Sequence, residues 1–133
     1  MTFRPDRLPQ GLRLGAYGFA VAVLLFLTLA PSNDLPEVDL WDKAEHASAW
    51  FVLTAIGLAF WPARPARVAA FALGLGAVVE VLQWAMPFGR DGDVRDLLAD
   101  SVGILVVVAT WAVLGARRRW LGLRASRGRG TAG

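Results

Sequence analysis

Four long apolar runs constrain this chain more than any other feature of its sequence. A helix needs about 20 mostly apolar residues to cross the hydrocarbon core of a bilayer. The runs extend over residues 12–30, 47–61, 68–86 and 97–115. The second run is the shortest, and it reaches spanning length only if the turn with Glu45 and His46 belongs to it. Backbone N–H and C=O groups in hydrocarbon must be paired within the chain, so we expect helices rather than strands.

The composition excludes most soluble alternatives. The chain has 133 residues, which is enough for one domain, and 56% of them are hydrophobic, which is too many for the polar exterior of a small soluble protein. The absence of Cys removes disulfides and thiolate chemistry, and the single His argues against a zinc site built from imidazoles. We therefore predict an all-α membrane protein with four transmembrane helices in one bundle.

The distribution of basic residues predicts the orientation of the bundle. Most of the fourteen Lys and Arg residues lie before the first run, between the second and third, or after the fourth. Basic loops stay in the cytoplasm, so we expect both termini on the cytoplasmic side. Arg4, Arg7 and Arg13 before an apolar run also resemble the start of a signal peptide, but Pro31 occupies the position after a cleavage at Ala30, and we expect an uncleaved first span.

This orientation divides the chain into three parts. We predict a cytoplasmic segment over residues 1–11, a four-helix membrane domain over 12–115 and a basic, disordered cytoplasmic tail over 116–133. The tail is rich in Arg, Gly and Ser, a composition typical of disorder. Its charge suits contact with anionic lipid, whereas nucleic-acid binding is not expected because no folded basic module accompanies it.

Polar residues near the outer ends of the second, third and fourth runs form the candidate site. Ionisable groups in a membrane cost several kcal/mol, so they usually face the protein interior and serve a function. Residues three or four positions apart share one face of a helix, and the polar residues in each run have this spacing. The candidate ligand-binding residues are Asp42, Lys43, His46, Glu80, Gln83, Arg90, Asp96 and Asp100. Among them His46, Glu80 and Asp100 are candidates for catalysis, and we expect no metal ion and no other cofactor.

Several of these residues also have simpler explanations. His46 near an interface is often a hydrated capping residue, and Asp96 suits the first turn of a helix. Gln83 is of the type that forms hydrogen bonds between membrane helices. Glu80 and Asp100 are harder to explain in this way, because each lies inside a span and a charged carboxylate there needs a partner or a proton.

The order of these residues resembles the pattern of the VanZ-like family of membrane proteins. The matching pieces are Asp42-Lys43-x-x-His46, Glu80-x-x-Gln83, Arg90 and Asp96-x-x-x-Asp100-x-x-Gly103, in the same order and on the same helices. The resemblance extends over about residues 12–115. One position departs from it: Asp100 stands where the family usually has Asn, which adds a carboxylate to the site.

The resemblance implies a small multi-pass protein of the bacterial inner membrane. The family takes its name from a protein linked to resistance to teicoplanin, a glycopeptide that binds peptidoglycan precursors. The resemblance therefore suggests an extracytoplasmic polar pocket that binds an envelope lipid or a cell-wall precursor head group, with membrane lipids as partners. A homo-oligomer or another membrane-protein partner is compatible with the sequence.

Two other functions are left open by the residues. The first is a small intramembrane enzyme with Glu80 or His46 as general base and Arg90 as an anion clamp, although Ser48 and Ser101 have no activating partner at a fixed spacing. A metal-assisted version of it would favour Mg²⁺, Ca²⁺ or Mn²⁺ over Zn²⁺. The second is a structural or accessory membrane protein whose polar groups only hold helices together.

Overall fold

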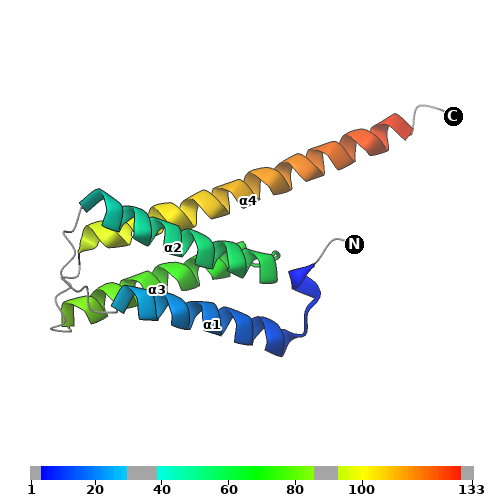
Figure 1. The fold of residues 1–133 in the computed structure, drawn as a ribbon. Helices are drawn as coiled ribbons and strands as arrows, with labels where there is room; N and C mark the ends of the chain where they lie inside the picture. Colours follow the sequence, from blue (N-terminus) through cyan, green and yellow to red (C-terminus); the bar gives the residue numbers. More distant parts are fainter. Residues whose placement is uncertain (1–3, 30–38, 86–92, 130–133) are drawn as a thin grey trace.

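The computed structural model describes residues 4–29, 39–85 and 93–129 of the chain. A short 3-10 helix, η1, precedes four long helices that pack into one bundle (Figure 1). The elements are η1 (Pro5–Arg7), α1 (Gln10–Leu29), α2 (Asp39–Phe60), α3 (Pro65–Ala85) and α4 (Val94–Arg129). The predicted all-helical class is therefore confirmed for the part of the chain that the structure describes.

Three of the helices are long and apolar enough to cross a membrane. They are α1, α3 and the first 25 residues of α4, Val94–Arg118. Large apolar side chains point out of the bundle on these helices: Phe19 and Phe26 are each 72% exposed and Val113 is 66% exposed. Such an exterior would be unfavourable in water and is favourable against lipid chains, which is consistent with a membrane protein.

Helix α2 has a different character from the other three. It begins at Asp39 and includes Glu45 and His46, so it reaches 22 residues but contains several charges in its first turns. Its middle is the most enclosed part of the bundle, since Trp50 and Thr54 are fully buried and Leu58 is 1% exposed. α2 packs most extensively against α4 and also contacts α1 and α3. It is the central helix of the core.

Two apolar clusters fill the bundle along its length. The larger cluster surrounds Trp50 and Val79 and draws residues from all four helices, and the smaller one joins Leu58, Val68 and Val107. Arg13 links the beginning of α1 to the end of α2, because its Nη1 donates a hydrogen bond of 2.9 Å to the Phe60 carbonyl. A basic side chain satisfies the last carbonyls of a helix well.

Helix α4 also includes residues 116–129, which we predict from their composition to be part of a disordered tail. In the structure α4 continues without a break to Arg129, and Figure 1 shows its last turns extending beyond the other helices. The segment is rich in Arg, Leu and Ala, which are good helix formers. An existing helix also propagates without a new nucleation cost, so a composition that suggests disorder in an isolated segment does not end the helix here.

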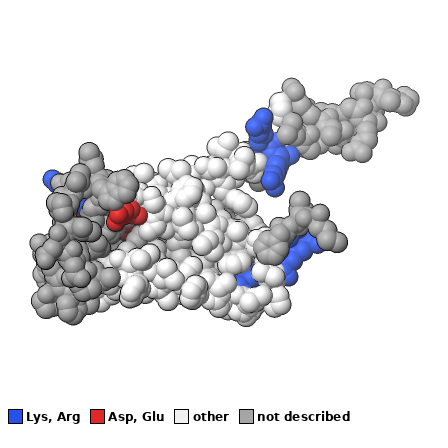
Figure 2. Space-filling model, viewed as in Figure 1, with Lys and Arg blue, Asp and Glu red and all other residues white. Residues whose placement is uncertain are grey.

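Charges are sorted along the bundle. Figure 2 shows most of the Lys and Arg side chains where α1 begins and α4 leaves the bundle, and acidic side chains, with a few basic ones, at the opposite end. The basic end holds Arg13, Arg64, Arg67, Arg117 and Arg118, and the opposite end holds Glu80, Asp93, Asp96 and Asp100. The beginning of α1 and the far end of α4 therefore lie on the same, basic side.

Candidate functional site

The centre of the candidate site is a buried pair between α2 and α4. Nδ1 of His46 lies 3.0 Å from Oδ1 of Asp100, the distance of a hydrogen bond from an imidazole N–H to a carboxylate. The His46 side chain is 4% exposed and that of Asp100 is fully buried. Two residues predicted for the site, 54 positions apart in the sequence, are thus in direct contact.

The two helices approach unusually closely beside this pair. Gly103 lies one turn after Asp100, and a Cβ built at Gly103 would come 2.1 Å from the backbone oxygen of Ala47. Only a glycine fits against a neighbouring backbone at that distance. The contact between Gly103 and Ala47 therefore brings His46 and Asp100 within hydrogen-bonding distance.

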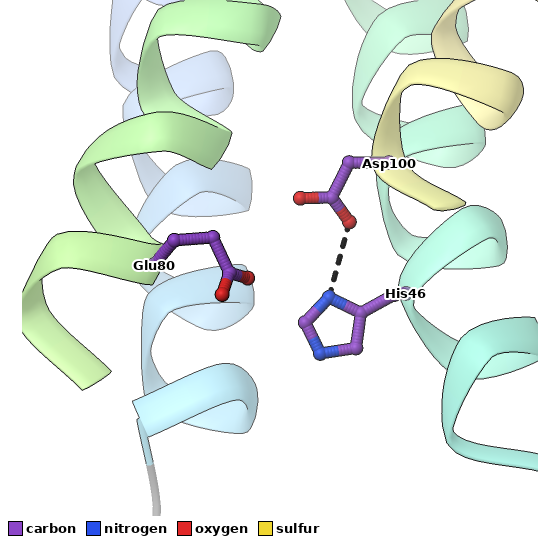
Figure 3. Close-up of side chains that lie close together, drawn as sticks. All are labelled: His46, Glu80 and Asp100. Carbon is purple, nitrogen blue, oxygen red and sulfur yellow. Dashed lines mark hydrogen bonds and ion pairs between the residues drawn. The ribbon is translucent and has the colours of Figure 1, made fainter. Parts of the chain in front are cut away.

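Glu80 of α3 adds a third side chain to the His46–Asp100 pair. One nitrogen of His46 and one oxygen each of Glu80 and Asp100 all lie within 4.8 Å of one another, and in Figure 3 the Glu80 carboxylate points toward the His46 ring. Oε2 of Glu80 accepts a 2.9 Å hydrogen bond from the backbone N–H of Asp93, just before α4. Three helices thus contribute to one cluster, and Glu80 also holds the beginning of α4 against α3.

Two oxygens of this cluster are buried without a partner. Among the residues that the structure describes, Oδ2 of Asp100 and Oε1 of Glu80 accept no hydrogen bond. A buried carboxylate oxygen without a partner is costly, and such atoms often mark a site that binds something.

Trp50 and Gly76 form the inner wall of the site. The Trp50 ring is stacked near the His46 ring, with centroids 6.0 Å apart and an angle of 11° between the planes. Trp50 Nε1 donates a 3.0 Å hydrogen bond to the Ala72 carbonyl. A Cβ at Gly76 would lie 3.0 Å from Oδ2 of Asp100, so this glycine leaves room for the carboxylate.

Trp50 is not among the site residues that the sequence predicts. A signal for it existed, because Trp50 follows His46 by four residues and so shares its helix face. The role of Asp93 was missed as well. Its position before α4 and its backbone contact with Glu80 become visible only once α3 and α4 are packed together.

Lys43 lies next to the cluster and is engaged by acidic residues of α4. Its Nζ donates a hydrogen bond to Oδ1 of Asp96 and a longer one, 3.4 Å, to Oδ2 of Asp93. The sequence predicts Lys43 to be a ligand-binding residue, and an ammonium group binds an anionic ligand. In the structure that ligand would have to compete with two carboxylates for the ammonium group.

Asp93 is the N-cap of α4. Its Oδ1 accepts a 2.9 Å hydrogen bond from the backbone N–H of Arg95, as expected for a residue that caps a helix start. That hydrogen bond is the main cause that lowers the pKa of Asp93, and Lys43 lowers this pKa further. Asp96, in the first turn, was predicted to suit a helix start and is placed there.

Gln83 occupies a separate place in the bundle. Its side chain is buried, and its Nε2 donates a 2.9 Å hydrogen bond to the Thr28 carbonyl of α1. This is the simpler of the two roles considered for it, a link between membrane helices. Gln83 thus connects α3 to α1, whereas Glu80, one turn away, faces α2 and α4.

Two further predicted site residues lie outside the described part. Arg90 belongs to a segment that the structure does not describe, and of Asp42 only the backbone position in the first turn of α2 is described. The roles assigned to their side chains remain predictions from the sequence.

The cluster can accept protons or bind a cation, and its serine neighbours are poorly placed for nucleophilic attack. Ser101 Oγ donates its hydrogen bond to the Leu97 carbonyl within its own helix, at 2.7 Å. Ser48 is exposed on α2 and lines an apolar groove next to α1, on another side of the helix from the cluster. In the described residues neither serine is hydrogen-bonded to His46.

Comparison of the chain with models of protein families, with curated protein sequences and with solved structures gave no match. The fold and the site define a class rather than a family. Over residues 4–29, 39–85 and 93–129 the chain is all-helical, with three helices suited to spanning a membrane and a largely buried His–Asp–Glu cluster at the acidic end of the bundle.

Proposed function

We propose that this chain is a VanZ-like protein of the bacterial inner membrane that binds the head group of an envelope lipid or a cell-wall precursor. In this proposal all four long helices span the membrane, with α2 as the fourth span, shielded within the bundle by the other three. The basic end is cytoplasmic, because basic residues are retained on that side. The acidic end then lies toward the extracytoplasmic leaflet.

The convergence of His46, Glu80 and Asp100 is the observation that supports this proposal most. Groups from three helices would not meet within 4.8 Å at one depth if they served only as separate helix caps. The two carboxylate oxygens without partners suit a ligand that donates hydrogen bonds, such as an amide, a hydroxyl group or an ammonium group. Arg90 is the residue proposed to hold an anionic part of the same ligand.

Native mass spectrometry of the purified protein with its co-purifying lipids tests this function. We expect the wild type to retain one specific adduct, and Glu80→Gln and Arg90→Ala to lose it. Glu45→Gln and Arg95→Ala are matched controls, because both side chains are exposed and neither belongs to the proposed site. A wild type that retains only the bulk phospholipids found equally on Glu80→Gln would contradict the proposal.

A link to glycopeptide resistance is tested separately in cells. If the site acts on a precursor that teicoplanin recognises, Glu80→Gln should change teicoplanin susceptibility at unchanged membrane levels of the protein. Glu45→Gln should behave as the wild type. Equal susceptibility of the wild type and both variants would remove resistance from the proposal and leave head-group binding to the mass measurement.

An intramembrane enzyme is the second candidate, and the His46–Asp100 pair is the observation that favours it. A carboxylate that holds an imidazole in one orientation is typical of a general base. In this version Glu80 or His46 removes a proton from a bound substrate and Arg90 stabilises the developing negative charge. Conversion of the retained adduct to a product of different mass by the wild type, and not by His46→Gln, would select this candidate.

A further inference from the structure

We propose that His46, Glu80 and Asp100 bind one divalent cation. They belong to α2, α3 and α4, respectively, so a bound ion would join three helices. One nitrogen of His46 and one oxygen of each carboxylate lie within 4.8 Å of one another. Two ligands of an ion at about 2.1 Å each are at most about 4.2 Å apart, so small side-chain rotations would close the site.

The oxygens without partners indicate which atoms would coordinate the ion. Oδ2 of Asp100 belongs to a fully buried side chain, and Oε1 of Glu80 is buried as well. The other oxygen of each carboxylate is already used, by His46 Nδ1 and by the Asp93 backbone N–H. Each carboxylate is therefore held in place through one oxygen, and its other oxygen is available. Hydrogen bonds of this kind commonly orient the side chains that coordinate a metal ion.

The charge of the cluster also matches a divalent cation. With both carboxylates ionised and the imidazole neutral, the cluster carries a charge of −2, which is unfavourable in a low-dielectric interior without a counter-charge. Lys43, a basic residue of the same end of α2, is engaged by Asp93 and Asp96. A divalent cation would neutralise the cluster and satisfy both available oxygens at once.

The ligand atoms, one imidazole nitrogen and two carboxylate oxygens, indicate which divalent ion the cluster would bind. Mg²⁺ and Ca²⁺ take oxygen ligands almost exclusively, imidazole suits Fe²⁺ and Zn²⁺, and Mn²⁺ is a first-row transition ion that carboxylates suit. One nitrogen and two carboxylate oxygens fit a first-row transition ion with positions left for water or for a ligand's phosphate. The inference replaces our expectation from the sequence that no metal binds. It stands independently of head-group binding, because cation binding is measured without any lipid ligand.

Mn²⁺ titration of the purified full-length protein tests the inference. Free Mn²⁺ is followed by its electron paramagnetic resonance signal in detergent, after the protein has been stripped with a chelator. We expect one saturable site per chain and an affinity at least about 10-fold lower in Glu80→Gln, Asp100→Asn and His46→Gln. Glu45→Gln and Asp6→Asn, which remove carboxylates outside the cluster, should bind Mn²⁺ as the wild type does.

A second readout uses the wild type alone and so does not depend on how well the variants fold. Mn²⁺ bound to His46 should show magnetic coupling to a ¹⁴N nucleus in pulsed spectra, and added Zn²⁺ should displace it. Absence of saturable Mn²⁺ binding, absence of nitrogen coupling, or wild-type affinity in both Glu80→Gln and Asp100→Asn would overturn the inference. None of these results depends on whether a lipid co-purifies.

Discussion

At the scale of single residues, Gly103 sets the separation of α2 and α4 beside the polar cluster. The atom that a side chain at Gly103 would meet is a backbone oxygen, that of Ala47, which cannot rotate away. Five other described glycines, Gly74 among them, have nothing within 4 Å of the position of a Cβ. The identity of this residue therefore matters for the distance between His46 and Asp100.

We predict that Gly103→Ala lowers the thermal stability of the detergent-solubilised protein. The added methyl group would lie 2.1 Å from the Ala47 oxygen, so α2 and α4 must separate, at a cost of about 1–3 kcal/mol. Gly74→Ala is the matched control, since nothing lies within 4 Å of its Cβ position. It should be neutral or gain up to about 1 kcal/mol through helix propensity. Equal melting temperatures for the two variants would contradict this role of Gly103.

Much of the residue-level site could be predicted from spacing, and the rest needed packing. His46 and Asp100 were both expected from the sequence because each is a polar residue in or next to an apolar run. The preference of Lys43 for Asp96 was not predictable, because it depends on the rotation and depth of two helices that are about 50 residues apart. Single-residue patterns identify which groups need a partner but not which partner they find.

At the scale of elements, the start of α4 is held by several side-chain contacts. Asp93 caps it from within the chain, and the Glu80 carboxylate accepts the Asp93 backbone N–H from outside. A helix start leaves several N–H groups without partners, and these two carboxylates satisfy part of that need. The first turn of α4 is thereby joined to α3 and, through Lys43, to α2.

We predict that the stabilising effect of Asp93 depends on pH. Its pKa is lowered, mainly by the Arg95 backbone N–H and further by Lys43, so folding favours the charged carboxylate. The contribution is complete above the ordinary Asp value of about 3.9 and is lost as the pH falls through the lowered pKa. Asp93→Ala should therefore melt below the wild type at pH 7, with a smaller difference near pH 3.

Val94→Ala is the control for this prediction. Val94 is 74% exposed and does not titrate, so its difference from the wild type should stay the same at both pH values. If the difference caused by Asp93→Ala is also independent of pH, the carboxylate charge does not stabilise the start of α4.

The helix boundaries were predictable where the sequence has strong punctuation. Pro65 begins α3, as suits a residue without a backbone N–H, and Asp39 begins α2, where an acidic residue is favourable. The far end of α4 differs from the expectation, because composition favours disorder in residues 116–129 whereas the structure places them in the helix. A helix already formed within the membrane extends past it as long as no residue stops it, and residues 116–129 contain no proline.

At the scale of the whole molecule, the sorting of charge gives the bundle two unlike ends. The end with the His–Asp–Glu cluster is largely acidic, whereas the end where α1 begins is largely basic (Figure 2). Trp84 is 81% exposed near the first end, and Trp120 is 52% exposed beyond the second, positions that suit the two interfaces of a membrane.

The proposed orientation predicts which connections are accessible from outside the cell. The chain has no native Cys, so single introduced cysteines report position without background. Ala63→Cys, between α2 and α3, should react with a membrane-impermeant thiol reagent only after the cells are permeabilised. Ser32→Cys, between α1 and α2 in the sequence, should react in intact cells. Reaction of Ala63→Cys in intact cells would contradict the four-span arrangement with cytoplasmic termini.

The unbroken course of α4 has a mechanical consequence. Asp100 lies near one end of this 36-residue helix, and the helix continues from there for about 44 Å at a rise of about 1.5 Å per residue (Figure 1). A tilt of about 5° pivoting at Asp100 would displace the distal turns sideways by about 4 Å. In the proposed orientation, binding at the cluster on the extracytoplasmic side would thus move the last turns of α4 on the cytoplasmic side.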